Sequence, residues 1–254
     1  MARVTLLTDF GTADGYVGAM KGVIASIFPG AILDDVSHEV PFGAVGAGAL
    51  ALARYWNRYP PGTVHLVVVD PGVGTARRAL AVEADRRLIV APDNGIVSRV
   101  LDAADEFRSV SIENPGFLPD ERSATFHGRD IFAPIAACLA RGVHLSRFGP
   151  EIADPVYLPE PGVSWESEAI VGEVVSTDGF GNLVTNLPGA SVDEASGVEI
   201  RGQKIPVVRT YGDLPPASLA ALVNSDGRVE VAARDSSAAE LLNADVGTRV
   251  RIPK

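Results

Sequence analysis

The sequence contains few cysteine, histidine or aromatic residues, and it has no long apolar run. Its 254 residues include one cysteine and four histidines, so Cys138 has no partner for an internal disulfide. The apolar surroundings of Cys138 favour a buried thiol in a cytoplasmic protein. No Cys/His cluster of the kind that binds zinc is present. No stretch approaches the roughly 20 apolar residues needed to span a bilayer, and the segment after Met1 lacks a signal-peptide pattern. We therefore expect a cytoplasmic protein with no metal site and no membrane partner.

Basic residues are also in the minority. Lysine and arginine number 22 against 32 acidic residues, which gives a formal net charge of −10 without any block of like charge. This balance argues against nucleic acid as a partner. The glycine-containing loop at residues 72–78 lacks the Gly-Lys-Ser/Thr of a phosphate-binding P-loop. A hydrophobic content of 46% with 21% charged residues is typical of a soluble globular protein.

Apolar strand patterns alternate with helical periodicity through residues 1–158. Strands are predicted at residues 4–8, 31–36, 66–69, 78–83 and 87–92, and helices at 15–28, 44–56 and 131–141. Such alternation favours an α/β fold with a largely parallel sheet between helices. We predict an N-terminal α/β sandwich domain over residues 1–158.

The pattern changes after a proline-rich stretch at residues 159–166, which is typical of a linker. Short strand patterns separated by turn residues follow at 169–177, 198–200, 205–208, 228–233 and 248–252. Several short strands in succession favour a small barrel or sandwich. We predict a smaller, all-β, barrel-like C-terminal domain over residues 167–254.

The most informative stretch lies at residues 65–77. An apolar β-branched run stops at Asp70-Pro71-Gly72, and Arg77 follows on the same loop. An acidic side chain at the carboxyl end of a buried parallel strand occupies the place where open α/β sheets bind ligands. Taken alone, Asp-Pro-Gly favours a plain turn capped by Asp70, with Arg77 as a solvated surface charge.

Two further strand ends carry polar side chains. Asp9 follows the first strand and Asp93-Asn94 follows the strand at 87–92, so a parallel sheet would bring both to the edge that holds Asp70. Asp9 could bind a ribose diol or, alternatively, cap the helix after Phe10. His127 lies on a loop before an apolar helix, where it could be catalytic or structural.

The C-terminal domain contains two polar, glycine-containing loops. The first, at residues 178–186, includes Asp178, Phe180 and Asn182. A hairpin turn would explain Asp178, whereas an aromatic ring and an amide on either side of a glycine would suit a flat heterocycle. The second loop, at residues 224–227, contains Ser225 and is compatible with a simple turn.

Seven segments in order give the chain a family resemblance. They read TDFG at 8–11, YVGAMKG at 16–22, VDPGVGT at 69–75, APDNG at 91–95, TFHGRD at 125–130, DGFGN at 178–182 and NS at 224–225. Together they resemble the S-adenosylmethionine hydroxide adenosyltransferase family, the adenosine-forming S-adenosylmethionine hydrolases. The fluorinating and chlorinating adenosyl enzymes are relatives of this family. The match covers nearly the whole chain.

The resemblance implies a catalytic Asp–Arg–His triad at Asp70, Arg77 and His127. The halogenating relatives are expected to carry tyrosine, threonine and tyrosine there, so this chain resembles the hydrolase. The implied reaction is in-line attack of an activated water at C5′ of S-adenosylmethionine, which releases adenosine and methionine and uses no cofactor. Asp70 and His127 both remain candidates for the proton acceptor. The alternatives are a halogenase that forms 5′-haloadenosine and a non-catalytic S-adenosylmethionine sensor.

The resemblance also implies substrate contacts and an assembly. The implied substrate-binding residues are Asp9, Phe42, Asn94, Asp178, Phe180, Asn182, Ser225 and Arg234. Of these, Asp9 would hold the ribose, Phe180 would lie against the base, and backbone near Arg234 would read the adenine edge. Asp226 departs from the fluorinating relatives, which carry an arginine near the substrate carboxylate. The family forms homotrimers with the site at the subunit interface, so we expect a homotrimer.

Overall fold

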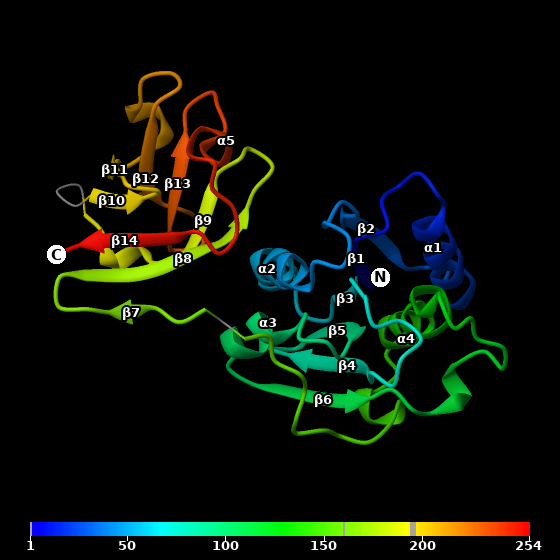
Figure 1. Ribbon diagram of the computed structural model, residues 1–254. Helices are drawn as coiled ribbons and strands as arrows, with labels where there is room; N and C mark the ends of the chain where they lie inside the picture. The colour runs from blue at the N-terminus through cyan, green and yellow to red at the C-terminus, as the bar shows by residue number, and fades with distance from the viewer. Residues whose placement is uncertain (1, 160, 194–196) are drawn as a thin grey trace. The chain divides into compact units, whose positions relative to one another are not determined.

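The computed structural model describes residues 2–159, 161–193 and 197–254, and the chain forms two compact units (Figure 1). Unit 1 is Met1–Leu158 and unit 2 is Pro159–Lys254. Within the described residues, no helix combines the length and apolar character needed to cross a membrane.

Unit 1 is built on a six-stranded sheet with the order β2-β1-β3-β5-β4-β6. The strands are β1 (Arg3–Thr8), β2 (Ile32–Ser37), β3 (Val64–Val68), β4 (Ala79–Ala84), β5 (Arg87–Pro92) and β6 (Phe107–Ser111). The neighbours β2, β1, β3 and β5 are parallel, whereas β4 runs antiparallel to both β5 and β6. A two-residue turn at Asp85 and Arg86, both with positive φ, makes this reversal, as in the hairpin turns that match strand twist.

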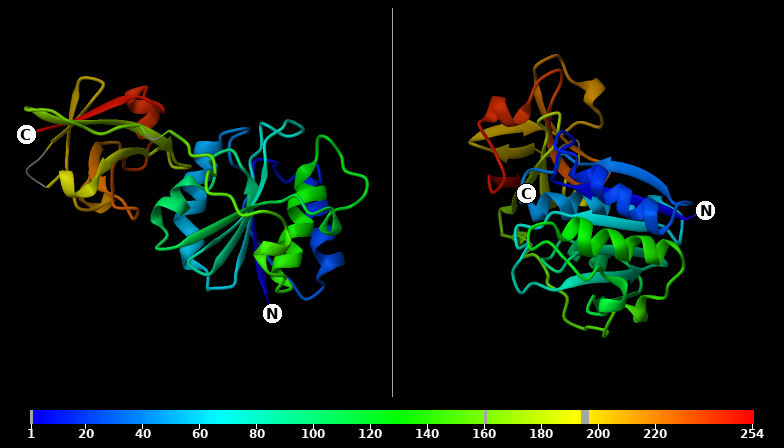
Figure 2. Two further views of the ribbon diagram at one scale, coloured as in Figure 1. Left: turned by 90° about the horizontal axis from the view of Figure 1, so that it is seen from below. Right: turned by 90° about the vertical axis from the view of Figure 1, so that its right-hand side faces the viewer.

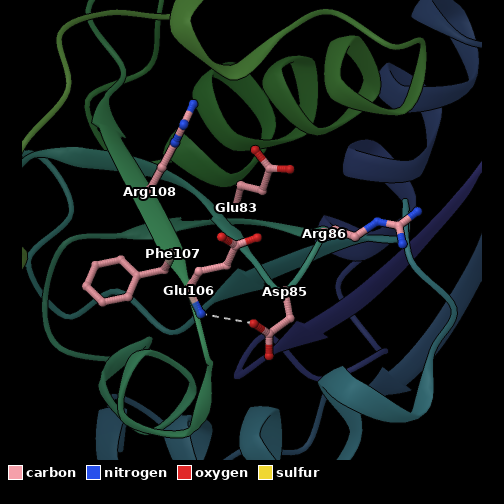
Figure 3. A pocket seen from close by; sticks show the side chains of 6 residues that line it. All are labelled: Glu83, Asp85, Arg86, Glu106, Phe107 and Arg108. Atoms are coloured by element: carbon pink, nitrogen blue, oxygen red, sulfur yellow. Dashed lines mark hydrogen bonds between the residues drawn. The ribbon is translucent and has the colours of Figure 1, made fainter.

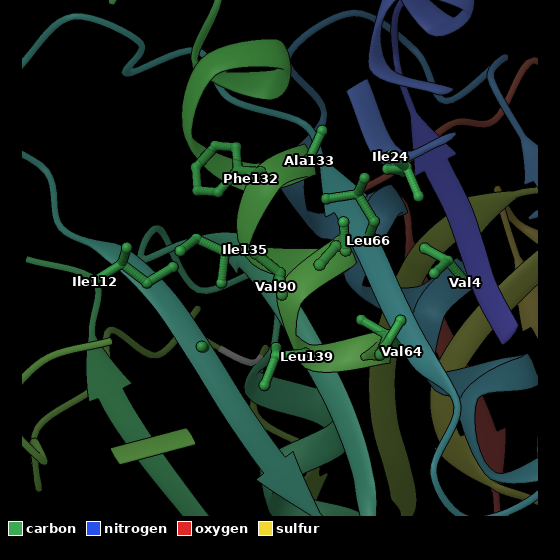
Figure 4. Packing of buried hydrophobic residues seen from close by; sticks show 14 of the residues in the cluster. Val4, Ile24, Val64, Leu66, Val90, Ile112, Phe132, Ala133, Ile135 and Leu139 are labelled. Carbon is green, nitrogen blue, oxygen red and sulfur yellow. The ribbon is translucent and has the colours of Figure 1, made fainter. Parts of the chain in front are cut away.

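Helices cover both faces of this sheet (Figure 2). Helices α1 (Tyr16–Ile27) and α4 (Ala133–Ala140) pack on one face, and α2 (Val45–Tyr55) and α3 (Ser98–Ala103) on the other. Successive side chains of β3 alternate between the two cores: Leu66 belongs to the first and Val67 to the second. Figure 4 shows the first core, where α4 side chains meet β3 and β5. This packing explains why the β3 sequence is apolar throughout.

Short helical turns complete unit 1. They are η1 (Trp56–Arg58), η2 (Pro115–Phe117), η3 (Gly128–Phe132) and η4 (Leu145–Arg147). The turn η3 is π-helical and leads directly into α4, so the helix predicted at 131–141 begins earlier and less regularly than expected. Single π-turns of this kind are common at functional sites.

Unit 2 is an antiparallel, barrel-like sheet around its own apolar core. Its elements are β7 (Ser164–Trp165), β8 (Ala169–Thr177), β9 (Leu183–Pro188), η5 (Gly189–Ser191), β10 (Gly197–Ile200), β11 (Gln203–Pro206), η6 (Tyr211–Asp213), β12 (Leu219–Val223), β13 (Arg228–Ala233), α5 (Ala238–Leu242) and β14 (Arg249–Pro253). The strand order is β11-β10-β14-β8-β9-β13-β12, and β7 pairs with β8. A bridge between Val207 and Ala221 brings the two ends of this order together.

The predicted fold class is confirmed, with differences in detail. An α/β unit and a smaller β unit are both present. The strands β6, β9 and β12 and the helices α3 and α5 were not predicted. The stretch 159–166 is not a linker throughout, because Ser164 and Trp165 pair with β8; its residue 160 lies outside the described residues.

Candidate active site

The parallel strands β1, β3 and β5 end at the same edge of the unit 1 sheet. They pair in register as neighbours, so the residues that follow them, including Asp9, Asp70 and Asp93, lie along this edge. Open α/β sheets bind ligands at the carboxyl edge of their strands. The polar side chains predicted from three separate strand ends therefore share one edge.

Asp70, Arg77 and His127 form a continuous chain of hydrogen bonds there. Arg77 Nε donates to Asp70 Oδ1 at 2.9 Å, and Arg77 Nη2 pairs with Asp70 Oδ2. The same Nη2 atom lies 2.8 Å from His127 Nδ1. The Asp70 and Arg77 side chains are only 5% and 10% exposed, so water screens their attraction weakly. The guanidinium also lies over the ring of Phe132, 5.1 Å from its centroid.

His127 is held as a neutral imidazole. A guanidinium only donates, so His127 Nδ1 accepts the Arg77 N–H and the ring proton is on Nε2. Burial, and then the positive charge of Arg77, lower the pKa of His127 below its ordinary value of 6.5. The chain thus presents a carboxylate, a fixed cation and an uncharged ring at neutral pH.

The loop between Asp70 and Arg78 is fixed at both of its bases. At one base, Asn94 Nδ2 donates to the Val69 carbonyl at 2.9 Å. At the other, Arg78 Nε donates to buried Asp93 at 2.7 Å, and the Asp93 backbone N–H donates to the Arg78 carbonyl at 3.0 Å. Asn94 Oδ1 accepts from the Ile96 backbone N–H at 3.2 Å. Asn94, one of the implied substrate-binding residues, therefore positions this loop through its side-chain hydrogen bonds.

The loop that carries His127 is fixed by Asp130. Its carboxylate accepts from the Ser123 backbone N–H at 2.8 Å and from Arg129 Nε at 2.6 Å. The Arg129 hydrogen bond is the main cause that lowers the pKa of Asp130. Gly74 lets the Asp70–Arg78 loop approach closely, since a Cβ there would lie 2.7 Å from the Ala124 carbonyl oxygen. Its φ of +78° also favours glycine.

A pocket of about 330 Å³ opens beside the triad, and Asp70 is the triad member that lines it. Its other lining residues are Asp9, Phe10, Tyr16, Phe42, Pro71, Val73, Thr125 and Phe126. Phe10, Tyr16 and Phe126 pack edge to face, with centroids 5.1 to 6.2 Å apart. Phe42 is 92% exposed at the rim. Apolar walls with two carboxylates suit a polar ligand with a flat or aliphatic body.

Asp9 is not a helix cap. Helix α1 begins at Tyr16 after Gly15, and Asp9 Oδ2 accepts from the Gly43 backbone N–H at 2.8 Å. This contact holds the carboxylate in the pocket wall. Asp9 is therefore placed to accept hydrogen bonds from ligand hydroxyl groups.

Unit 2 carries a second pocket, of about 300 Å³. Phe180, Asn182, Tyr211, Gly212 and the segment 233–235 line it. Phe180 is 82% exposed, so its ring is available to a ligand. The pocket brings together three of the implied substrate-binding residues, Phe180, Asn182 and Arg234, and their contact with a substrate stays a prediction. Tyr211 was missed, because it stands in irregular sequence with no motif around it.

Asp178 shapes the loop that presents Phe180. Its Oδ1 accepts from the backbone N–H groups of Phe180 and Asn182, each at 2.9 Å, and its Oδ2 accepts from Asn182 Nδ2 at 3.0 Å. Gly181 packs on the start of α5, where a Cβ would lie 2.2 Å from Ser237 Oγ. In this structure, the Asp178 and Asn182 side chains thus bond mainly to their own β8–β9 turn.

Ser225 lies apart from this pocket. It belongs to the β12–β13 turn, whereas residues 233–235 follow the other end of β13. A six-residue strand spans about 20 Å. A ligand that contacted both Ser225 and Arg234 would have to extend along the strand.

Two other pockets contain none of the predicted residues. Figure 3 shows one of about 270 Å³, with Glu83, Asp85, Arg86, Glu106 and Arg108 among its residues, at the edge of the sheet opposite to Asp70. The other, of about 710 Å³, is lined by α1, η2 and α4 and borders Arg129 and Asp130. Across the described part of the chain, no group of three or more His, Cys, Asp or Glu side chains is arranged to hold a metal ion.

Comparison with known proteins matches both units to the domains of one family. Residues 4–149 match the SAM hydroxide adenosyltransferase N-terminal domain, and residues 172–251 match the C-terminal domain of that family. A protein named (R)-S-adenosyl-L-methionine hydrolase from Salinispora tropica is 43% identical, covering 98% of this chain and 97% of its own. One of the same name from Thermus thermophilus is 39% identical over 99% of this chain and 100% of its own.

A solved structure shares the fold. The crystal structure of an uncharacterized conserved protein from Thermotoga maritima superimposes with a TM-score of 0.91 at 35% identity, covering 99% of this chain and 100% of the other. The two units thus correspond to the two domains of an adenosyl-transferring class of protein. The chain belongs to the SAM hydroxide adenosyltransferase family.

Proposed function

We propose that the protein hydrolyses S-adenosyl-L-methionine to adenosine and L-methionine. The observation that carries the proposal is the Asp70–Arg77–His127 chain at the wall of a pocket that also contains Asp9. The hydrolase name of the Salinispora tropica relative supports it. The reaction itself requires no cofactor, because both the electrophile and the leaving group belong to the substrate.

With this substrate, the nucleophile needs activation and the leaving group does not. Its sulfonium makes C5′ electrophilic, and methionine leaves as a neutral thioether that needs no proton. The protein must therefore position a water in line and favour its hydroxide-like form. The fixed positive charge of Arg77 does this in a weakly screened site.

Within the triad, Asp70 is assigned the proton-acceptor role. It is the member that lines the pocket, whereas His127 Nδ1 is occupied by Arg77. His127 is outside the pocket lining and acts by accepting from Arg77 through Nδ1, which orients the guanidinium beside Asp70. General base catalysis of this kind contributes about 10²–10⁴-fold. Water attack at C5′ then forms the C5′–O bond as the C5′–S bond breaks, and the water proton passes to Asp70.

Substrate recognition draws on both units. Asp9 binds the ribose hydroxyls, Phe42 packs against the sugar, and Phe180, Asn182 and Arg234 bind the adenine. Ser225 and Asp178 are assigned to the methionine end. By kinship with the family, the working form is a cytoplasmic homotrimer in which the site is completed at the subunit interface. Sedimentation equilibrium tests the trimer directly.

The decisive experiment is incubation with S-adenosyl-L-methionine in ¹⁸O-labelled water, followed by mass spectrometry of the nucleoside. The proposal requires adenosine with ¹⁸O at the 5′ position, and loss of this product in Arg77→Ala. Recovery of intact substrate with detectable binding would instead identify a sensor.

Halogenation is the second candidate, because a protein named Fluorinase from Actinoplanes sp. (strain N902-109) is 25% identical over 99% of this chain. Excess chloride or fluoride in the same assay separates the two reactions. A 5′-haloadenosine as the main product would replace the hydrolytic proposal.

A further inference from the structure

Glu230 is a buried carboxylate that the proposed mechanism does not use. It lies within β13 and is 3% exposed. Its Oε1 accepts from the Tyr211 hydroxyl at 2.6 Å, and its Oε2 accepts from Asn224 Nδ2 at 3.2 Å. Both donors are neutral groups, and a buried polar side chain needs hydrogen bonds of this kind to offset its loss of water. These two hydrogen bonds therefore hold the Glu230 side chain in one orientation.

The first bond fixes a wall of the unit 2 pocket. Tyr211 is 45% exposed and lines this pocket together with Phe180, while its hydroxyl is directed away to Glu230. Burial, and then the hydrogen bond to Glu230, raise the pKa of Tyr211 well above its ordinary value of 10.0. The hydroxyl thus remains a donor at neutral pH and holds the ring in one orientation.

The second bond reaches the turn at the opposite end of β13. Asn224 Oδ1 accepts from the backbone N–H groups of Asp226 at 3.0 Å and Arg228 at 3.1 Å. Asn224 therefore fixes the turn that contains Ser225. One buried carboxylate connects this turn to the aromatic wall of the pocket.

We infer that Glu230 is a positioning residue for adenine recognition, which orients Tyr211 in the pocket wall and couples that wall through Asn224 to the turn at residues 224–228. This inference rests on the proposed function, since it assumes that the pocket binds adenine. It follows that ligand contact at the turn at residues 224–228 changes the affinity of the pocket for adenine.

The test is calorimetric binding of adenosine to the full chain, together with steady-state hydrolysis of S-adenosyl-L-methionine. Tyr211→Phe retains the ring and removes only the tethering hydroxyl. We expect its affinity for adenosine to fall about tenfold, with KM raised in proportion and kcat unchanged within about twofold. A merely structural defect would lower kcat through loss of folded protein and would leave KM unchanged.

Glu230→Gln provides a second, independent variant. The amide oxygen of the introduced glutamine can still accept from the Tyr211 hydroxyl. Its amide nitrogen can only donate, as Asn224 Nδ2 does, so the hydrogen bond to Asn224 is lost. We expect a smaller loss of adenosine affinity in Glu230→Gln than in Tyr211→Phe. In the Tyr211→Phe background, Glu230→Gln should cause no further loss of adenosine affinity, because the hydrogen bond between residues 211 and 230 is already absent. Tyr157→Phe is the matched control, since Tyr157 is 46% exposed and lines neither the pocket beside Asp70 nor the unit 2 pocket.

The outcomes separate the two proposals. Adenosine binding to Tyr211→Phe and Glu230→Gln within twofold of a binding-competent wild type would overturn the inference and leave the hydrolase proposal standing. A wild-type protein that neither binds adenosine nor hydrolyses S-adenosyl-L-methionine would overturn both.

Discussion

Lowering the pH from 7 to 5 is expected to destabilise unit 1 by about 2 kcal/mol through His65 alone. This residue of β3 is fully buried between the rings of Tyr55 and Tyr59, and its Nδ1 lies 2.8 Å from Thr5 Oγ1. Burial lowers the pKa of His65 from 6.5 to about 4. Because the folded pKa is the lower one, the unfolded state binds the proton first. Stability therefore falls as the pH drops below 6.5 and levels off below about 4, with a full loss of about 3 kcal/mol.

Urea unfolding followed by Trp56 fluorescence measures this effect. The chain has two tryptophans, and Trp165→Phe leaves buried Trp56 as the reporter of unit 1. In this background, His65→Asn removes the titrating ring, and the difference in unfolding free energy between pH 7 and 5 should shrink by about 2 kcal/mol. His144→Asn, at an exposed histidine, should retain the original difference. If His65→Asn kept the full pH dependence, the assignment to His65 would be wrong.

Three further predictions concern the site. Arg77→Lys should lower kcat for adenosine release at least about 100-fold, because an ammonium cannot bond Asp70 and His127 with the same planar geometry; activity within tenfold of wild type would contradict the role of Arg77. Phe180→Ala should raise KM about tenfold through lost stacking, whereas an unchanged KM would remove Phe180 from the base site. Gly74→Ala should destabilise unit 1 by about 1–3 kcal/mol in the Trp56 assay, because its Cβ would approach the Ala124 carbonyl oxygen to 2.7 Å and its φ is +78°; unchanged stability would show that this approach relaxes freely.

Local sequence patterns were sufficient for much of unit 1. The apolar run before Asp70 predicted β3 correctly, because a strand buried on both faces needs no polar alternation. The direction of β4 was beyond local prediction, since it depends on positive φ at Asp85 and Arg86, which are not glycines. The contact between Arg77 and His127 spans 50 residues of sequence, and only the family resemblance indicated it.

Unit 2 was harder to predict because its polar residues are satisfied by distant partners. Strand β9 was interpreted as part of a loop, since Thr185 and Asn186 are polar. In the fold, Thr185 Oγ1 donates to the Val229 carbonyl at 2.7 Å, and Asn186 Oδ1 accepts from the Glu173 N–H at 2.8 Å. Such pairing is non-local, and so is the bond between Glu230 and Tyr211 that fixes a pocket wall.

The hydrogen bonds that fix both ends of the Asp70–Arg78 loop to the sheet have a consequence for the evolution and engineering of this fold. Asn94 and Asp93 secure the loop through the Val69 carbonyl and the Arg78 guanidinium, and these two side-chain contacts do not involve the carboxylate of Asp70. Arg77 Nη1 adds a longer hydrogen bond, of 3.4 Å, to the Arg78 carbonyl. The reactive residues of this loop can therefore be exchanged while the hydrogen bonds that hold the loop to the sheet remain. One scaffold can thereby present different nucleophile-activating groups to the same pocket without being refolded around them.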